Sequence, residues 1–242
     1  TPRRNSGGIN LKFTVIAGTP GSGKTSVLSS LTNALISFGM HPSIVKVDCL
    51  WTEDDKRLSR LGVPVKAALS KDMCPDHFAI YNTEDMISWA RDNGSDILLN
   101  ETAGLCLRCA PYPNDCLAVC VIDITSGPNN PLKVGPLMTS ADVVMMTKGD
   151  MVSQAEREVF RERVLEANPT CTPIEANGLT GKGSAELAEI VSRSKDVSSD
   201  MRLRNNPPFS ICTLCAGETR IGKEHQRGVL RRMDGFTDYR GE

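Results

Sequence analysis

The chain has 242 residues, of which 40% are hydrophobic and 24% charged, with a net charge of −1 and a sequence pI near 6.3. This length allows one large α/β domain or two small ones, with a substantial core. The balanced charge indicates neither a nucleic-acid nor a membrane partner, and no run of about 18 apolar residues predicts a transmembrane helix. Because the N-terminus also lacks the apolar core of a signal peptide, we expect a cytoplasmic protein.

The first predicted elements follow a polar stretch, residues 1–11, which we expect to be a flexible lead-in. The stretch Phe13 to Ser26, FTVIAGTPGSGKTS, fits the phosphate-binding pattern G-x-x-x-x-G-K-[ST]. Residues 13–17 form an apolar run rich in β-formers, and residues 26–38 carry apolar side chains at helical spacing. A strand, a glycine-rich loop and a helix in this order are the context that a phosphate-binding loop requires.

The residue types of this loop fit phosphate chemistry. Glycines leave backbone N–H groups free to donate to phosphate, and the start of the helix adds partial positive charge. Lys24 is expected to reach the β- and γ-phosphates, and the Thr25 hydroxyl to ligate Mg²⁺. The residues expected to bind nucleotide in this loop are Gly18, Gly21, Ser22, Gly23, Lys24, Thr25 and Ser26.

Strands and helices alternate after the loop. Further strands are predicted at 43–47, 96–100, 117–122, 143–147 and 173–176. Helices are predicted at 53–61, 76–91, 154–167 and 184–194. The alternation predicts βαβ units, and therefore an α/β fold of the P-loop NTPase type, with a mostly parallel sheet and helices on both faces. We place this domain at residues 12–194.

The composition changes after Ser194. Residues 195–208 are polar and end in a Pro-Pro pair, which predicts a linker. Residues 209–242 carry a Cys-x-x-Cys motif and a basic stretch, and we expect an appended segment outside the sheet. We call residues 209–242 the C-terminal segment.

Nine cysteines are many for a cytosolic enzyme, and their number is odd. Two Cys-x-x-Cys pairs stand out, Cys106 with Cys109 and Cys212 with Cys215. In a reducing compartment such pairs favour metal, iron–sulfur or redox chemistry over structural disulfides. Two unrelated surface thiols remain the alternative for the pair at Cys212 and Cys215.

Several motifs occur in the order known from the metallochaperone NTPases, a family that includes the urease accessory GTPase and the hydrogenase nickel-incorporation GTPase. In chain order they are GTPGSGKTS, VKVDCLWTEDDKRL, CPDH, NETAG, VIDITSG and KVGPLMTSADVVMMTKGD. The chain resembles this family from about Phe13 to Val191. The glycine loop alone is shared with many proteins, whereas an Asp-ended strand followed by T-E-D and then Cys-Pro-…-His is far more specific.

The resemblance implies roles for residues beyond the loop. Asp48 matches an acid that helps to organise Mg²⁺ and the attacking water, and helix capping is its structural alternative. Glu101 and Gly104 match a γ-phosphate-sensing switch. Lys148 and Asp150 match the guanine-recognition motif N-K-x-D, although Thr147 replaces its Asn. We therefore expect GTP to be preferred, with ATP as the alternative.

The resemblance also implies a metal site. Cys74 and His77 resemble the family's Cys-Pro-His pair, with Asp76 as an inserted residue. In that family two subunits complete the site, so a homodimer is expected. Thiolate and imidazole ligands favour Ni²⁺ or Zn²⁺. The further candidate ligands are Cys106, Cys109, Cys212 and Cys215.

These features together predict a dimeric, Mg²⁺-dependent NTPase that couples hydrolysis to metal delivery to a client metalloenzyme or its accessory protein. One alternative is a reductive activator, in which cysteines of two subunits hold a [4Fe–4S] cluster. Another is a scaffold that binds nucleotide and partner without turnover.

Overall fold

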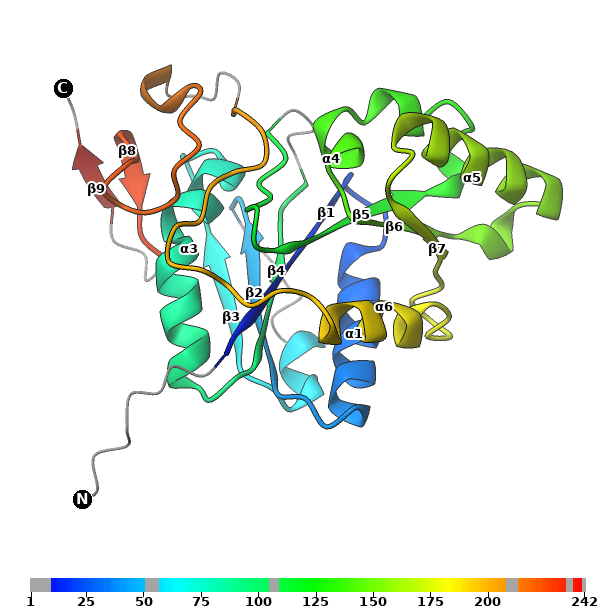
Figure 1. The fold of residues 1–242 in the computed structure, drawn as a ribbon, viewed down its shortest axis with the longest axis horizontal. Coiled ribbons are helices and arrows are strands. Elements are labelled where there is room, and N and C mark those ends of the chain that lie inside the picture. Colours follow the sequence, from blue (N-terminus) through cyan, green and yellow to red (C-terminus); the bar gives the residue numbers. More distant parts are fainter. Residues whose placement is uncertain (1–9, 51–56, 105–108, 208–212, 234–236, 241–242) are drawn as a thin grey trace.

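The computed structural model describes residues 10–50, 57–104, 109–207, 213–233 and 237–240. Its centre is a seven-stranded parallel sheet in the order β3-β2-β4-β1-β5-β6-β7 (Figure 1). The strands are β1 (Lys12–Gly18), β2 (Pro42–Asp48), β3 (Val65–Leu69), β4 (Ile97–Glu101), β5 (Leu117–Asp123), β6 (Val143–Thr147) and β7 (Thr172–Glu175). The α/β fold predicted from the sequence is confirmed.

Helices cover both faces of the sheet. They are α1 (Lys24–Ser37), α3 (Pro75–Asp92), α4 (Pro136–Thr139), α5 (Gln154–Ala167) and α6 (Ser184–Ser192). Short 3₁₀ turns lie at Ser59–Leu61, Ile124–Ser126, Pro131–Lys133, Gly149–Met151 and Thr213–Cys215. Within the described residues, no helix combines the length and the apolar character needed to cross a membrane.

The core has two layers because side chains of a strand alternate between the faces of the sheet. Phe13 and Val15 of β1 point into the layer that contains α3, α4 and α5, and Ile16 points into the layer of α1 and α6. All three side chains are fully buried. Burial on both faces explains why the central strands read as continuous apolar runs in the sequence.

Strand β3 is the strand of the seven-stranded sheet that the sequence pattern did not predict. It reads VKAAL and pairs with β2 in a parallel register from Ile44–Val65 to Asp48–Leu69. Two alanines and a lysine give no β-branched run, and this strand is half-buried at the edge of the sheet. The helix expected at 53–61 begins in residues that lie outside the described ones, and its end, Ser59–Leu61, is a 3₁₀ turn.

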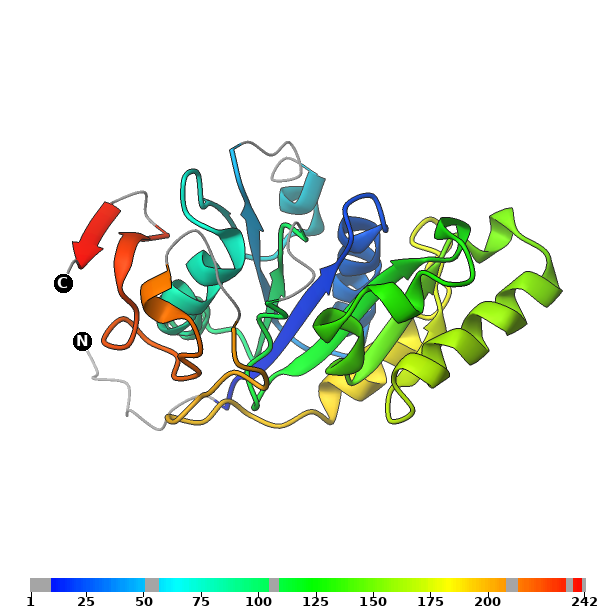
Figure 2. The ribbon, with the colours of Figure 1, turned by 90° about the horizontal axis from the view of Figure 1, so that it is seen from above.

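Residues 195–207, expected to be a linker, run in contact with the domain. The N–H of Val197 donates to the carbonyl of Leu11 at 2.8 Å, and the N–H of Arg204 donates to the carbonyl of Tyr112 at 2.9 Å. The C-terminal segment then forms a separate antiparallel pair, β8 (Gly228–Arg231) and β9 (Thr237–Arg240). It lies beside α3, at the end of the molecule away from α5 (Figures 1 and 2).

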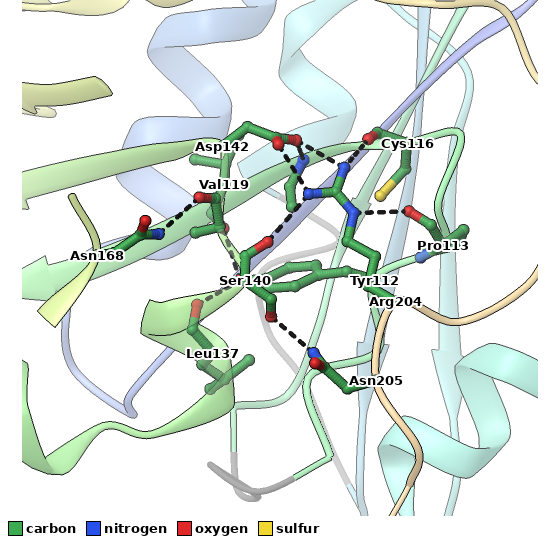
Figure 3. Close-up of polar contacts among 12 residues, drawn as sticks. Tyr112, Pro113, Cys116, Val119, Leu137, Ser140, Asp142, Asn168, Arg204 and Asn205 are labelled. Atoms are coloured by element: carbon green, nitrogen blue, oxygen red, sulfur yellow. Dashed lines mark hydrogen bonds and ion pairs between the residues drawn. The ribbon is translucent and has the colours of Figure 1, made fainter. Parts of the chain in front are cut away.

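One side chain, Arg204, fastens this stretch to the amino-terminal ends of β5 and β6 (Figure 3). Its guanidinium donates to both carboxylate oxygens of Asp142, at 2.8 and 2.7 Å. It also donates to three backbone carbonyls, those of Pro113, Cys116 and Ser140, at 3.1, 2.6 and 3.0 Å. The planar fork of arginine suits such a convergence of acceptors.

Replacing Arg204 by Met should lower the free energy of unfolding by about 2 kcal/mol, because bonds to a charged donor are lost while their acceptors stay partly buried. Urea denaturation of the two proteins measures the difference. Arg202→Met is the matched control, since the Arg202 side chain forms an exposed ion pair with Asp200 and its loss should change stability by less than about 0.5 kcal/mol. Equal effects of the two substitutions would contradict the role given to Arg204.

Candidate functional site

The glycine loop lies at the carboxyl end of β1 and leads directly into α1, as its sequence predicts. A β-carbon on Gly104 would lie 2.1 Å from the carbonyl oxygen of Gly18 and 2.7 Å from the Lys24 Nζ. The φ of Gly104 is +75°, a conformation that other residues rarely adopt. Glycine is therefore required at position 104, where the backbone after β4 touches the loop.

Lys24 folds back over the loop in this structure. Its Nζ donates to the carbonyls of Gly18 and Thr19, at 3.2 and 3.1 Å, and only 7% of the residue is exposed. Burial lowers the pKa of the Lys24 ammonium, and the nearby carboxylate of Glu101 opposes that shift. Gly18 and Thr19 offer this buried cation neutral carbonyls, so a negatively charged group bound at the loop would stabilise it further.

Four side chains from three elements meet beside the loop. The hydroxyl of Thr25 donates to Glu101 Oε1 at 2.7 Å, and the Lys46 Nζ donates to the same oxygen at 2.8 Å. Lys46 is also 3.5 Å from Asp48 Oδ2. The parallel register of β2 and β4 pairs Lys46 with Glu101 directly.

Two features of this cluster bear on its chemistry. Glu101 Oε2 is buried and has no hydrogen-bond partner in the described part of the chain. The donor atoms of Thr25, Asp48 and Glu101 are all oxygens, the type that Mg²⁺ prefers. Lys46 was not predicted from the sequence, and its signal is a lysine inside the otherwise apolar strand IVKVD.

Replacing Lys46 by Met should lower the free energy of unfolding by about 3–5 kcal/mol, because Glu101 then stays buried without its cation. The double variant Lys46→Met/Glu101→Gln should recover much of that loss, since the buried charge is also removed. Urea denaturation measures all three proteins.

Lys12→Met is the control for the Lys46 variant, because the Lys12–Asp196 pair is partly exposed and is worth less than about 1 kcal/mol. If Lys46→Met were no more costly than this control, Lys46 would not be the counter-ion of Glu101.

The candidate base pocket lies at the carboxyl ends of β6 and β7. Thr147, which replaces the Asn of N-K-x-D, donates its hydroxyl to the carbonyl of Ser22 at 2.6 Å and so ties β6 to the glycine loop. The Lys148 Nζ lies 2.6 Å from Asp123 Oδ2. A cavity of about 220 Å³ is lined by Asp150 on one side and by Ala176 and Asn177 on the other.

The sequence analysis did not predict that residues after β7 form one side of this cavity. A β-carbon on Gly178 would lie 2.3 Å from Cβ of Ser26, so the turn after β7 packs against the start of α1. The available signal was Ala-Asn-Gly directly after a predicted strand, since the carboxyl ends of parallel strands share one edge of the sheet.

The predicted metal-binding residues of α3 are covered by the C-terminal segment. Cys74 stands at the N-cap of α3, and His77 lies in its first turn. His77 is 7% exposed, and its Nε2 is 2.7 Å from Gln226 Oε1. Burial lowers the pKa of His77, while the bond to Gln226 opposes the shift.

Further cysteines line a cavity of about 20 Å³ next to His77. It is lined by Cys74, His77, Cys109, Cys215, Glu218 and Gln226, together with two apolar residues. Cys106 and Cys212 lie outside the described residues. Among the residues that are described, no three side chains of ligand type surround one point closely enough to hold a metal ion.

Other cysteines are packing residues. Cys116 and Cys120 belong to the core layer of α3 and α5. Burial raises the pKa of each of these thiols to about 12, so both are protonated at neutral pH.

Residues 12–175 match the family described as CobW/HypB/UreG, nucleotide-binding domain. The chain belongs to this family. Its resemblance to the metallochaperone NTPases is thereby confirmed, and the chain is a P-loop NTPase.

Sequence relatives and solved structures agree with the family. Protein MJ0120 of Methanocaldococcus jannaschii, which is uncharacterized, is 61% identical over 234 residues, covering 96% of this chain and 100% of that protein. Urease accessory protein UreG of Yersinia pestis is 29% identical over 197 residues, covering 74% of this chain and 87% of UreG.

The structure of HypB from Helicobacter pylori in complex with nickel has a TM-score of 0.63 at 20% identity, covering 78% of this chain and 92% of HypB. At that identity the likeness concerns the fold. Because the similarity to MJ0120 covers 96% of the chain, it extends into the C-terminal segment that covers α3.

The site residues predicted from the sequence fall into two groups in space. Gly18, Lys24, Thr25, Asp48, Glu101 and Gly104 gather around the loop, and Lys148 and Asp150 lie just after β6, which β5 separates from β1. The second group lines the cavity beside α3 and consists of Cys74, His77, Cys109 and Cys215.

Proposed function

We propose that this chain is a Mg²⁺-dependent GTPase that couples hydrolysis to the delivery of a transition-metal ion, Ni²⁺ or Zn²⁺, to a client metalloenzyme or its accessory protein. One observation carries the proposal. The stretch after β4 has Gly104 pressed against the phosphate loop and Cys109, five positions later, on the thiol-lined cavity. Five positions in the sequence therefore separate the contact at the phosphate loop from a cysteine of that cavity.

The donor atoms beside the loop fit Mg²⁺. Thr25 and Asp48 would hold the ion directly or through water, and the orphaned Oε2 of buried Glu101 provides a further acceptor. When bound, the ion neutralises negative charge that develops on the phosphates. Lys24, now bonded to the loop carbonyls, would pair with the phosphates, and Glu101 would orient the Thr25 hydroxyl that donates to it.

GTP is our preferred nucleotide because of the pocket at β6. The Asp150 carboxylate lines the cavity and can accept from the two N–H donors of a guanine edge, which adenine does not offer. Thr147, which stands in place of the Asn, ties β6 to the loop through the Ser22 carbonyl.

The relatives support a metal-related role. One is named a urease accessory protein, and another, named HypB, was solved in complex with nickel. We extend to this chain a transition-metal cargo, a homodimeric state and a cytoplasmic location. The client enzyme would receive the ion when hydrolysis changes the contact between Gly104 and the phosphate loop.

Replacing Lys24 by Ala should slow GTP hydrolysis by about 10²–10³-fold, because a preorganised positive charge at the transferring phosphate is lost. Phosphate release under single-turnover conditions measures the effect. Lys195→Ala, at an exposed lysine after α6, is the control for loss of positive charge. Hydrolysis by Lys24→Ala at the parent rate would place the active site elsewhere.

Replacing Asp150 by Asn should reduce the preference for GTP over ATP, since the amide presents a donor to guanine N–H groups where the carboxylate accepts. Competition titrations with GTP and ATP on parent and variant give the ratio of dissociation constants, which should fall by about tenfold or more. Tighter binding of ATP than of GTP by the parent protein would overturn the assignment.

A further inference from the structure

The Lys46 ammonium lies where the oxygen atoms beside the glycine loop converge. Its Nζ donates to Glu101 Oε1 at 2.8 Å and to Thr25 Oγ1 at 3.3 Å. Asp48 Oδ2 lies 3.5 Å from the same nitrogen. These are the three side chains that the proposed function assigns to the Mg²⁺ site, and one ammonium contacts all of them at once.

The sheet itself directs Lys46 to this point. Side chains of a strand alternate between the two faces, so Lys46 shares the face of Ile44, which packs in the layer of α1. The parallel register sets Lys46 directly opposite Glu101. Only 5% of Lys46 is exposed, so little water competes for its charge. The ammonium is therefore a built-in counter-ion of Glu101.

Lys24, the lysine of the glycine loop, has a separate place. Its Nζ donates to the carbonyls of Gly18 and Thr19, at 3.2 and 3.1 Å. The two lysines therefore have different partners. Lys24 contacts the backbone of the loop, and Lys46 contacts the acidic side chains next to it.

An ion and the ammonium cannot share these oxygens. Mg²⁺ requires oxygen ligands at about 2.0–2.1 Å. The same groups surround the Lys46 Nζ at 2.8 to 3.5 Å, so either cation fills the space between them. Two positive charges at such a buried point also repel strongly, because little water screens them. Ion binding therefore requires that the end of the Lys46 side chain turns away.

The charge balance decides which ligand can displace Lys46. Mg²⁺ alone would leave the displaced ammonium buried without a counter-ion, which is costly. A nucleotide brings negatively charged phosphate oxygens to the loop, and these can accept from an ammonium. Its arrival together with the ion supplies a partner for both cations. The cluster therefore favours joint binding of Mg²⁺ and nucleotide over binding of the ion alone.

We propose that Lys46 is a positioning residue that occupies the Mg²⁺ position and yields it only to Mg²⁺ and nucleotide together. The inference rests on the proposed function, which supplies both ligands. By holding Thr25 and Glu101 in place, Lys46 keeps the site assembled. By competing with the ion, it raises the Mg²⁺ concentration at which nucleotide binds tightly.

The test measures binding of the fluorescent analogue mant-GDP to the full chain over a range of Mg²⁺ concentrations. Lys46→Met removes the competing charge and keeps an unbranched side chain. The Mg²⁺ concentration for half-maximal tight binding should fall by about tenfold or more, because the site no longer has to release its own cation. Lys12→Met is the matched control, since the Lys12 ammonium pairs with Asp196 at the other end of β1, and it should behave as the parent does.

The parent and a second variant give independent readouts. In the parent, Mg²⁺ alone should leave the thermal unfolding temperature unchanged, whereas Mg²⁺ with GDP should raise it. Lys46→Gln removes the charge but keeps a hydrogen-bond donor for Glu101, so it should remain folded and lower the Mg²⁺ requirement as Lys46→Met does. In both neutral variants, Mg²⁺ alone should raise the unfolding temperature. Circular dichroism confirms the fold of each variant.

The outcomes separate this role from the proposed function. An equal or higher Mg²⁺ requirement in the neutral variants would overturn the inference, and so would stabilisation of the parent by Mg²⁺ alone. The proposed function survives either result if the parent hydrolyses GTP with Mg²⁺. A protein that shows the expected dependence on Lys46 but hydrolyses no GTP would overturn the proposed function and leave the role of Lys46 standing.

Discussion

The close approach of Gly104 to Gly18 is the constraint on which the rest of the site depends. No side chain fits between the backbone after β4 and the end of β1, so the two segments touch directly. Lys24 is packed into the same contact. Any group that displaces Lys24 or the loop must therefore also shift residues 102–104, because closely packed backbone cannot absorb the displacement.

Buried charge makes this arrangement responsive. Lys46 and Glu101 are each almost fully buried, and one oxygen of Glu101 lacks a partner among the described residues. Such a cluster is stable only while every charge has a counter-charge, so a phosphate or a divalent cation changes the balance of the whole group. The parallel register of β2 and β4, which pairs Lys46 with Glu101, makes this a property of the sheet itself.

Local sequence patterns were enough to predict the sheet, the glycine loop and most helices, because apolar periodicity and glycine spacing reflect local constraints. Strand β3 was not predicted, because its alanines and lysine match no strand pattern. The buried position of Lys46 was not predicted, because a lysine in a strand is normally exposed to solvent. The meeting of Cys215 with Cys74 depends on how separate segments pack, and no local pattern contains that information. The roles given to Asp48, Lys148 and Asp150 stay predictions.

The attachment of Arg204 gives the C-terminal segment a short tether. Eleven positions separate Arg204 from Cys215, a span that even a fully extended chain limits to about 40 Å. A segment that lifts from α3 while Arg204 holds stays at a high effective concentration, of the millimolar order, near its own docking face. A protein that competes for this face must then displace an intramolecular partner at that effective concentration.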